Sequence, residues 1–186
     1  MEENLTQEQS LIKRVVICGP ESTGKSTMTK HLSVFFKTNY VDEFARDFLQ
    51  KKWDSKKEIC SKEDLIQIAK GQIKAENTNI KNSNKLIFCD TNILTTLAWS
   101  RTHFDEFCDP WLEKQSKLLT YDHYLILNTD IPWVEDDLRD RPKDRKKMFL
   151  AHKKELDNLN VDYNIINDSD FEKRFNQAVE YIKNKY

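Results

Sequence analysis

The sequence predicts an α/β fold in which a five-stranded parallel sheet is covered by helices on both faces. Five short apolar runs are predicted to be strands, at residues 14–18, 39–41, 86–89, 123–127 and 163–166. Three of them contain VVIC, LIFC and YLIL, which do not alternate apolar with polar residues and so indicate burial on both faces. Helical patterns fill the intervals, and this alternation predicts parallel strands joined by right-handed crossovers.

The helices are predicted from apolar spacing and from residues that favour helix starts. Met28, Leu32, Phe35 and Phe36 fall on one helix face and are expected to point inward. The other predicted helices begin near the capping-box-like pair Ser61 and Asp64, at Asp109-Pro110, at Pro142 (running to about Asn158) and at Asp170.

The length of 186 residues suits a single domain, which we expect to span residues 1–186 with an N-terminal extension at 1–13. The formal net charge is −1, so no overall field attracts nucleic acid or an anionic membrane. The four cysteines have no zinc-type spacing, and Cys18 and Cys89 lie in apolar runs typical of reduced, buried thiols. With no signal peptide and no apolar run of ~20 residues, the expected location is cytoplasmic.

Residues 19–26, GPESTGKS, match the phosphate-binding pattern GxxxxGK[ST] in full. A buried strand precedes the motif and an amphipathic helix follows it, which predicts a P-loop NTPase fold. The glycines let backbone N–H groups turn toward phosphate, and the helix start adds its positive dipole end. We expect ATP to be bound by the residues of this loop, namely Gly19, Pro20, Glu21, Ser22, Thr23, Gly24, Lys25, Ser26 and Thr27.

Within the loop, Lys25 is expected to reach the β- and γ-phosphates and Ser26 to offer its hydroxyl to Mg²⁺. Asp90 follows the apolar run LIFC, where a Walker-B-type carboxylate belongs. It is predicted to hold Mg²⁺ through water or to orient an attacking hydroxyl. Capping of the helix that starts near Thr91 is an alternative role, and it is compatible with the others.

Two further charged features are predicted to face the loop. Asp42 and Glu43 end the second strand, and Glu43 and Arg46 have i, i+3 spacing at the start of a short helix, so they share a helix face. We expect them to accept a proton and steady the transferring phosphate; the alternative is a surface ion pair worth ~0.5 kcal/mol or less. The segment at about 132–147 is predicted to be a lid whose arginines, Arg139, Arg141 and Arg145, close over the triphosphate. Its alternative is a solvated helix face of mixed charge.

Taken together, five strings resemble the ribosylnicotinamide kinase domain that forms the C-terminal part of NadR-type proteins of NAD salvage. They are VICGPESTGKST, VDEFAR, IAKGQ, LIFCDTNILTT and IPWVEDDLRD, and the similarity runs from about Val15 to the last helix. The patterns CDTxxLTT and PWVxDxLRD are more specific than the P-loop. The resemblance implies ATP- and Mg²⁺-dependent phosphorylation of the 5′-hydroxyl of nicotinamide riboside, giving nicotinamide mononucleotide.

The resemblance also implies residue roles. Catalysis is expected from Lys25, Glu43, Asp90 and Arg139, and phosphate binding also from Arg141. Substrate binding is expected from Glu43, Arg46, Asp90, Trp133 and Asp136, and metal binding from Ser26 and Asp90. Asp42 and Asp137 stand where proline and glycine are common, and Asp137 bears on the conformation of the lid. About a dozen residues precede the first strand, so the adenylyltransferase and DNA-binding parts of longer relatives are not expected here.

The fixed positive charge of nicotinamide riboside calls for aromatic faces and carboxylates. Trp133, beside three acidic residues at 135–137, supplies both. Trp99 and Trp111 are alternative aromatic candidates, although packing in the core or against a helix is the favoured prediction for them. Two other functions remain open from sequence: another nucleoside or nucleotide kinase, or a P-loop regulatory ATPase. The sequence does not predict the oligomeric state.

Overall fold

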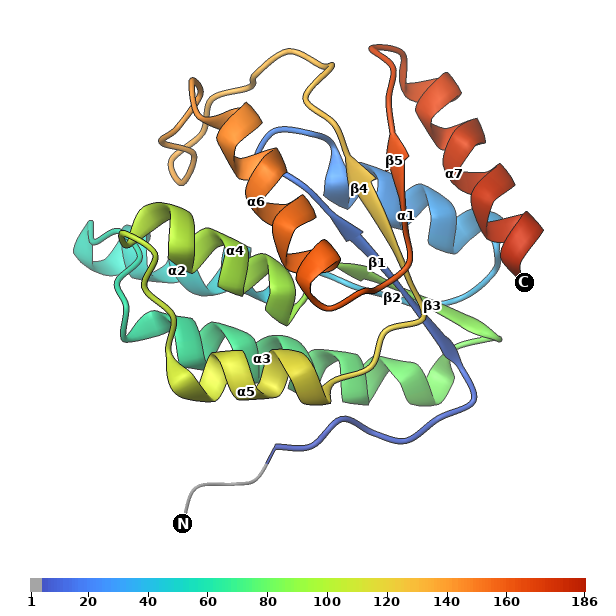
Figure 1. Cartoon of the computed structure of the whole chain (residues 1–186), viewed down its shortest axis with the longest axis horizontal. Helices are drawn as coiled ribbons and strands as arrows, with labels where there is room; N and C mark the ends of the chain where they lie inside the picture. The colour runs from blue at the N-terminus through green and yellow to red at the C-terminus, as the bar shows by residue number, and fades with distance from the viewer. Residues whose placement is uncertain (1–4) are drawn as a thin grey trace.

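A computed structural model describes residues 5–186 and contains one five-stranded sheet (Figure 1). The strand order is β2 (Tyr40–Val41), β3 (Leu86–Asp90), β1 (Lys13–Cys18), β4 (His123–Leu127) and β5 (Tyr163–Ile166). Every neighbouring pair is parallel, so the predicted sheet is confirmed. All carboxyl ends of the strands therefore lie at one edge, where ligands bind in sheets of this kind.

Seven α-helices and one short 3₁₀ turn, η1 (Ile80–Asn82), surround the sheet in the described part of the chain. The helices are α1 (Lys25–Phe35), α2 (Phe44–Lys56), α3 (Asp64–Asn79), α4 (Ile93–His103), α5 (Pro110–Leu118), α6 (Arg145–Asn158) and α7 (Phe171–Lys185). Helices α1 and α7 cover one face, and α3 to α6 cover the other (Figure 1). Helix α2 packs on α3 and has no fully buried side chain.

Two hydrophobic clusters, one on each face, explain why the central strands are apolar throughout. Val15 and Ile17 of β1 join the cluster on the side of α1 and α7. Val16 and Cys18 join the cluster on the side of α3 to α6. Because side chains alternate between the faces of a strand, a strand covered on both sides needs apolar residues at consecutive positions.

Three predicted helix starts are confirmed by their capping contacts. Asp109 accepts hydrogen bonds from the backbone N–H groups of Trp111 (2.8 Å) and Leu112 (3.4 Å). Asp170 accepts one from the backbone N–H of Lys173 at 3.0 Å. Before α3, the Asp64 carboxylate reaches back to the backbone N–H of Ser61 at 2.7 Å, which is one half of a capping box.

Two predictions about the helices are wrong. Helix α6 begins at Arg145 and not at Pro142, because the residues before it form a turn in which the backbone N–H of Asp144 donates to the carbonyl of Arg141 at 3.2 Å. Phe35 was expected to point inward, but it is 45% exposed. It lies in the last turn of α1 at the margin of the sheet, where its edge meets the ring of Phe175 on α7.

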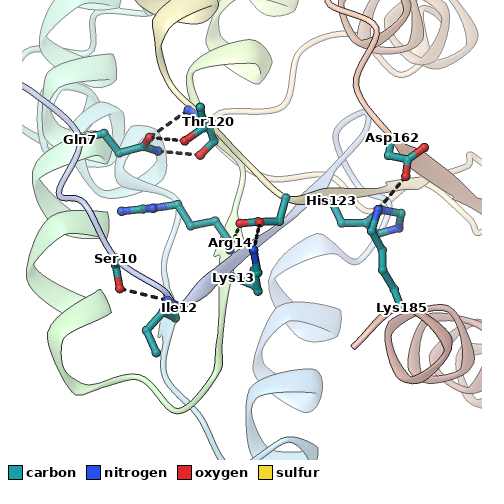
Figure 2. A network of polar contacts seen from close by, with 10 residues as sticks. Gln7, Ser10, Ile12, Lys13, Arg14, Thr120, His123, Asp162 and Lys185 are labelled. Carbon is teal, nitrogen blue, oxygen red and sulfur yellow. Dashed lines mark hydrogen bonds and ion pairs between the residues drawn. The ribbon is translucent and has the colours of Figure 1, made fainter.

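At the amino ends of the strands, polar contacts join the chain before β1 to the rest of the fold (Figure 2). Gln7 makes three hydrogen bonds with Thr120, at 2.9–3.1 Å. The Asp122 carboxylate accepts from the Lys13 ammonium and from the Arg14 backbone N–H, both at 2.9 Å. Hydrogen bonds and an ion pair within the protein therefore connect the segments at the amino end of the sheet. No helix in residues 5–186 is long and apolar enough to cross a membrane.

Candidate active site

The loop between β1 and α1 has the backbone conformation that phosphate binding requires. Gly19 has φ +131° and Gly24 has φ +81°, which are conformations that glycine adopts without strain. Gly19 also lies against the end of β4, since an added Cβ would be 2.6 Å from the carbonyl oxygen of Leu127. The loop thus sits tightly at the carboxyl edge of the sheet and directs the start of α1 toward it.

The start of α1 is available to an anion. No side chain among the described residues caps the N-terminus of α1, and its first turn contains no acidic residue. Its backbone N–H groups and positive dipole end are therefore free to bind phosphate. The Lys25 ammonium donates to the Pro20 carbonyl at 2.9 Å, and the Thr23 hydroxyl donates to the same oxygen at 2.8 Å.

A cavity of about 410 Å³ opens from this loop toward α2, α3, α4 and α6. Most of the predicted site residues line it: Gly19, Glu21, Ser22, Thr23, Gly24, Lys25, Ser26, Thr27, Glu43, Arg46, Arg139 and Arg141. The others lie outside the lining: Pro20, Asp90, Trp133, Asp136 and Arg145. The structure therefore gathers the P-loop, the start of α2 and part of segment 132–147 around one space.

Asp90 lies at the end of β3, 1% exposed, and does not cap α4. That role belongs to Asn92, whose side chain accepts from the backbone N–H groups of Leu94 and Thr95, so the capping alternative is wrong. The Oδ1 atom of Asp90 is buried with no hydrogen-bond partner among residues 5–186. Burial raises the pKa of Asp90 to about 7, helped by the charge of Glu43 and opposed by Lys25 and the Ser26 hydroxyl.

Arg46 pairs with the segment beyond β4 and not with Glu43. Its guanidinium donates to both oxygens of Asp136, at 3.1 and 2.8 Å, although the two residues are 90 positions apart. Arg139 also contacts this carboxylate, with Nε 3.0 Å from Oδ2. The pKa of Asp136 is lowered because hydrogen bonds from Arg46 and the Leu138 backbone N–H outweigh the effect of burial. Asp136 thereby connects α2 to segment 132–147.

The three arginines predicted to act together have different positions. Arg139 and Arg141 line the cavity, and they donate to the backbone carbonyls of Val134 (2.6 Å) and Thr102 (3.0 Å). Arg145 is outside the cavity lining and donates to the carbonyls of Ser22 (2.9 Å) and Ile131 (2.8 Å). Arg145 therefore attaches α6 to the back of the P-loop.

Aromatic residues at the cavity differ from the prediction. Trp133 lies outside the lining, with its indole N–H buried and without a partner in the described part of the chain. Trp99, which was expected to pack in the core or against a helix and was the alternative candidate for the acceptor, is half-buried and lines the cavity. Its ring is stacked on His103, with centroids 3.9 Å apart and planes 13° apart.

One wall of the cavity, formed by α4 and α6, was not predicted from the sequence. Its residues that face the cavity include Thr95, Thr96, Trp99 and His103 of α4, and Met148 and His152 of α6. Thr95, Trp99 and His103 are spaced by four residues, so they lie on one face of the helix that directly follows Asp90. This spacing is the signal that could have identified them from the sequence.

Ionisable groups in the cavity have shifted pKa values. The pKa of Glu21 is raised to about 7, mainly by burial; the charge of Lys25 opposes this shift, and the charges of Asp140 and Glu43 add to it. Burial lowers the pKa of both His103 and His152 to about 4. At neutral pH both imidazoles are therefore uncharged.

Residues 14–174 match a family described as an AAA domain, AAA_28. The chain belongs to this AAA domain family. The match covers the P-loop, the cavity and all five strands.

Curated relatives carry the name "Trifunctional NAD biosynthesis/regulator protein NadR". The chain is 27% identical to the protein of Escherichia coli K12 and 28% identical to that of Salmonella typhimurium LT2, each over 174 residues. These matches cover 92% of this chain but 42% of each relative, so the chain spans less than half of their length. They confirm the resemblance to NadR that the sequence motifs predicted.

Solved structures confirm the fold. A crystal structure of NadR protein in complex with NR has a TM-score of 0.79 at 19% identity, covering 94% of this chain and 50% of that one. Thymidylate kinase from Ehrlichia chaffeensis has a TM-score of 0.64 at 10% identity, covering 92% and 98%. Deoxyadenosine kinase from M. mycoides with bound dCTP has a TM-score of 0.61 at 11% identity, covering 92% and 99%. The chain therefore has the α/β fold of P-loop kinases.

The donor atoms at the loop suit a divalent cation bound beside phosphate. The Ser26 side chain is exposed at the start of α1, and Asp90 has a buried oxygen without a partner. Oxygen ligands of this type match the preference of Mg²⁺, which keeps several waters and binds through one or two carboxylates together with substrate phosphates.

Proposed function

We propose that this chain is a ribosylnicotinamide kinase, which transfers the γ-phosphoryl group of ATP to the 5′-hydroxyl of nicotinamide riboside in NAD salvage. The observation that carries the proposal is the continuous cavity. It begins at a P-loop and extends into a chamber lined by Glu43, Arg46 and Trp99. The similarity to NadR over 92% of the chain supports this acceptor, because a NadR structure is in complex with NR.

On the donor side, the P-loop backbone and the start of α1 bind the phosphates of ATP. Lys25 turns from the Pro20 carbonyl, 2.9 Å away, to the β- and γ-phosphates. Ser26 and Asp90 hold Mg²⁺, which neutralises charge on the phosphates when bound. The unpartnered Oδ1 atom of Asp90 supports this assignment, since buried carboxylate oxygens normally have a partner.

On the acceptor side, we assign Glu43 as the residue that orients the 5′-hydroxyl and accepts its proton. Glu43 lines the cavity at the start of α2, whereas Asp90 lies outside the lining. Arg46 and Asp136 form the ion pair that places this part of α2 against segment 132–147. Their predicted role in substrate binding is thus one of positioning.

Segment 132–147 acts as the lid of a single kinase domain. Arg139 and Arg141 line the cavity and neutralise charge on the transferring phosphate. Arg145 holds the lid base to the P-loop through the Ser22 carbonyl. Closure of this segment excludes water, so that phosphate passes to the riboside.

The pyridinium of the acceptor is placed at Trp99. An aromatic face and nearby carboxylates attract a fixed cation, and the cavity carries Glu43, Glu58 and Asp137. Trp133, the first candidate from the sequence, is not among the residues that line this cavity. We place the reaction in the cytoplasm, and the free thiols of Cys18 and Cys89, both buried, support a reducing compartment.

An acceptor panel tests the proposal. ADP formation is measured with ATP and Mg²⁺ in the presence of nicotinamide riboside, thymidine, deoxyadenosine or thymidine monophosphate. We expect nicotinamide riboside to give the highest kcat/KM and a phosphorylated product. Preference for thymidine or a monophosphate would identify the nucleoside or nucleotide kinase alternative. ATP turnover that nicotinamide riboside leaves unchanged would identify a regulatory ATPase.

The two carboxylates are separated by their dependence on Mg²⁺. Glu43→Gln is expected to lower kcat at least tenfold at saturating Mg²⁺ without changing the Mg²⁺ concentration for half-maximal rate. Asp90→Asn is expected to raise that concentration, and extra Mg²⁺ should restore part of the rate. If Glu43→Gln changes the Mg²⁺ requirement and Asp90→Asn does not, Glu43 binds Mg²⁺ and Asp90 accepts the proton.

A further inference from the structure

Glu21, His103 and Asp140 come together at the mouth of the cavity, outside the pair Ser26 and Asp90 that we assign to Mg²⁺. Each of the three offers one ligand atom, and these atoms all lie within 4.8 Å of one another. Glu21 belongs to the P-loop, His103 is the last residue of α4, and Asp140 lies in segment 132–147. Three separate parts of the fold therefore contribute one group each.

His103 is oriented in the way that a metal-binding histidine usually is. Its Nδ1 atom lies 3.0 Å from the Trp99 carbonyl oxygen and 3.0 Å from the Thr102 hydroxyl. A backbone carbonyl only accepts, so Nδ1 carries the proton and Nε2 presents a lone pair. Ligating histidines characteristically donate their other ring N–H to a carbonyl or carboxylate, which fixes the tautomer and the ring.

The Nε2 atom of His103 lacks the partner that burial normally requires. The side chain is 5% exposed, and no residue in the described range forms a hydrogen bond with Nε2. Stacking on Trp99 keeps the ring from turning away, with the centroids 3.9 Å apart. A buried lone pair with a fixed direction, 3.8 Å from an oxygen of Asp140, is a site for a positively charged ligand.

One small ion can be held after a small adjustment of the side chains. Two ligands of the same zinc ion are at most about 4.4 Å apart, because Zn–N and Zn–O distances are about 2.0–2.2 Å, whereas the three ligand atoms here lie within 4.8 Å of one another. The Nε2 atom of His103 and the Oδ1 atom of Asp140 are 3.8 Å apart, already within this limit. The Asp140 side chain is 59% exposed, so it provides access from solvent and has freedom to adjust.

The ligand set selects a transition metal over Mg²⁺. Imidazole nitrogen suits Zn²⁺, Cu²⁺, Fe²⁺ and Ni²⁺, whereas Mg²⁺ prefers oxygen ligands alone. One histidine and two carboxylates make three protein ligands, which is the number found in zinc sites that keep a position open for water or substrate.

We propose that Glu21, His103 and Asp140 form a second metal site that binds a transition-metal ion such as Zn²⁺. The ion connects the P-loop, α4 and segment 132–147. Bound metal holds Asp140 in place between Arg139 and Arg141, the two arginines that line the cavity. On the basis of the proposed kinase function, Zn²⁺ at this site slows turnover by restricting the lid, and it does so without displacing Mg²⁺.

The test is calorimetric titration of the full chain with Zn²⁺ in the absence of nucleotide. We expect one equivalent to bind, with 5 mM Mg²⁺ causing less than a threefold loss of affinity. His103→Gln and the exposed-residue variant Asp140→Asn should each weaken binding at least about tenfold. Thermal melting in the presence of EDTA verifies that both variants fold. Titration with Co²⁺ should add the d–d absorption of a bound ion, and His103→Gln should abolish it.

Two control variants separate this site from other donors. His31→Gln changes an exposed histidine on α1, and Cys60→Ser changes the thiol that lines the same cavity; both should bind Zn²⁺ like the unmodified chain. The proposal is overturned if Zn²⁺ does not bind, if His103→Gln and Asp140→Asn bind normally, or if Mg²⁺ displaces the ion. These readouts need no kinase activity, so failure of the acceptor panel leaves them unaffected.

Discussion

The two ends of the parallel sheet both bury a carboxylate, but they differ in how fully its two oxygens are hydrogen-bonded. At the amino end, Glu76 is 1% exposed and accepts from the Tyr121 hydroxyl, with its two oxygens 3.1 and 3.3 Å away. At the carboxyl end, Asp90 is equally buried, and its Oδ1 atom has no partner in residues 5–186. An unsatisfied buried polar group costs about 1–3 kcal/mol, so the difference is large on the scale of protein stability.

The same contrast extends to the neighbours of these groups. The amino end pairs Asp122 with Lys13 and Gln7 with Thr120, although Arg14 Nε and His123 Nε2 lack partners there (Figure 2). The carboxyl end leaves polar atoms unpartnered at the cavity wall, among them Thr95 Oγ1, His103 Nε2 and His152 Nε2, within the described chain. Thr91, next to Asp90, also has φ +66°, a strained conformation for a β-branched residue. The cavity wall thus has several polar atoms that a bound ligand is expected to pair.

The largest expected effect comes from a lysine at the carboxyl end. Lys25→Met is expected to lower kcat roughly 10²–10³-fold, because it removes a charge that stabilises the transferring phosphate. The matched control at the amino end is Lys13→Met, which breaks an exposed ion pair with Asp122. That change should leave kcat within about twofold and alter stability by about 1 kcal/mol or less. Steady-state kinetics measure kcat for both variants, and urea unfolding measures their stability. Comparable losses of kcat would contradict the proposed functional difference between the two ends of the sheet.

The next effect is on stability, at the turn that places the P-loop. Gly19→Ala is expected to destabilise the fold by roughly 3 kcal/mol, because Gly19 has φ +131° and the new Cβ would meet the backbone of Leu127. Gly24→Ala is the control, since it also has positive φ but its nearest neighbour, a carbon of Ile131, is 3.7 Å away. Gly24→Ala should lower the free energy of unfolding by about 1–2 kcal/mol. Urea unfolding that ranks Gly24→Ala as the more damaging change would contradict this account.

The smallest effect separates the two buried carboxylates by pH. Burial raises the pKa of Asp90 to about 7 and that of Glu76 to about 8, from ordinary values near 4. The folded state therefore binds these protons more tightly than the unfolded state, and stability falls as pH rises from about 4 through 7 or 8. Asp90→Asn and Glu76→Gln remove this loss, so both variants should gain stability relative to the unmodified chain between pH 5 and pH 9. Shifts of about three pKa units limit this gain to at most roughly 4 kcal/mol.

Activity then distinguishes the two variants. Asp90→Asn should lower kcat at least tenfold at ordinary Mg²⁺ concentrations, because Asp90 is the carboxylate that we assign to Mg²⁺ binding. Glu76→Gln should leave kcat within about twofold, since Glu76 lies at the amino end of the sheet and does not line the cavity. Urea unfolding at pH 5, 7 and 9, together with kcat, measures both. Equal losses of activity would remove the functional distinction between the two ends.

Several features were predictable because they depend on residues close together in the chain. The strands followed from continuous apolar runs, and the starts of α5 and α7 followed from Asp109 and Asp170. The P-loop needs only eight consecutive residues, so its conformation was implied by GPESTGKS. The first residue of α6 was misplaced because Pro142 suits a helix start and also a turn, and the turn contacts decided between them.

The sequence by itself determined the parallel α/β sheet, the phosphate-binding loop and the resemblance to NadR, since each rests on local spacing or on contiguous motifs. Only the tertiary structure decided that Arg46 pairs with Asp136, that Trp99 and not Trp133 lines the cavity, and that Asp90 keeps an oxygen without a partner. It likewise brought Glu21, His103 and Asp140 together. These relations join residues tens of positions apart, and a side chain's partner across such a distance is set by how helices pack on the sheet.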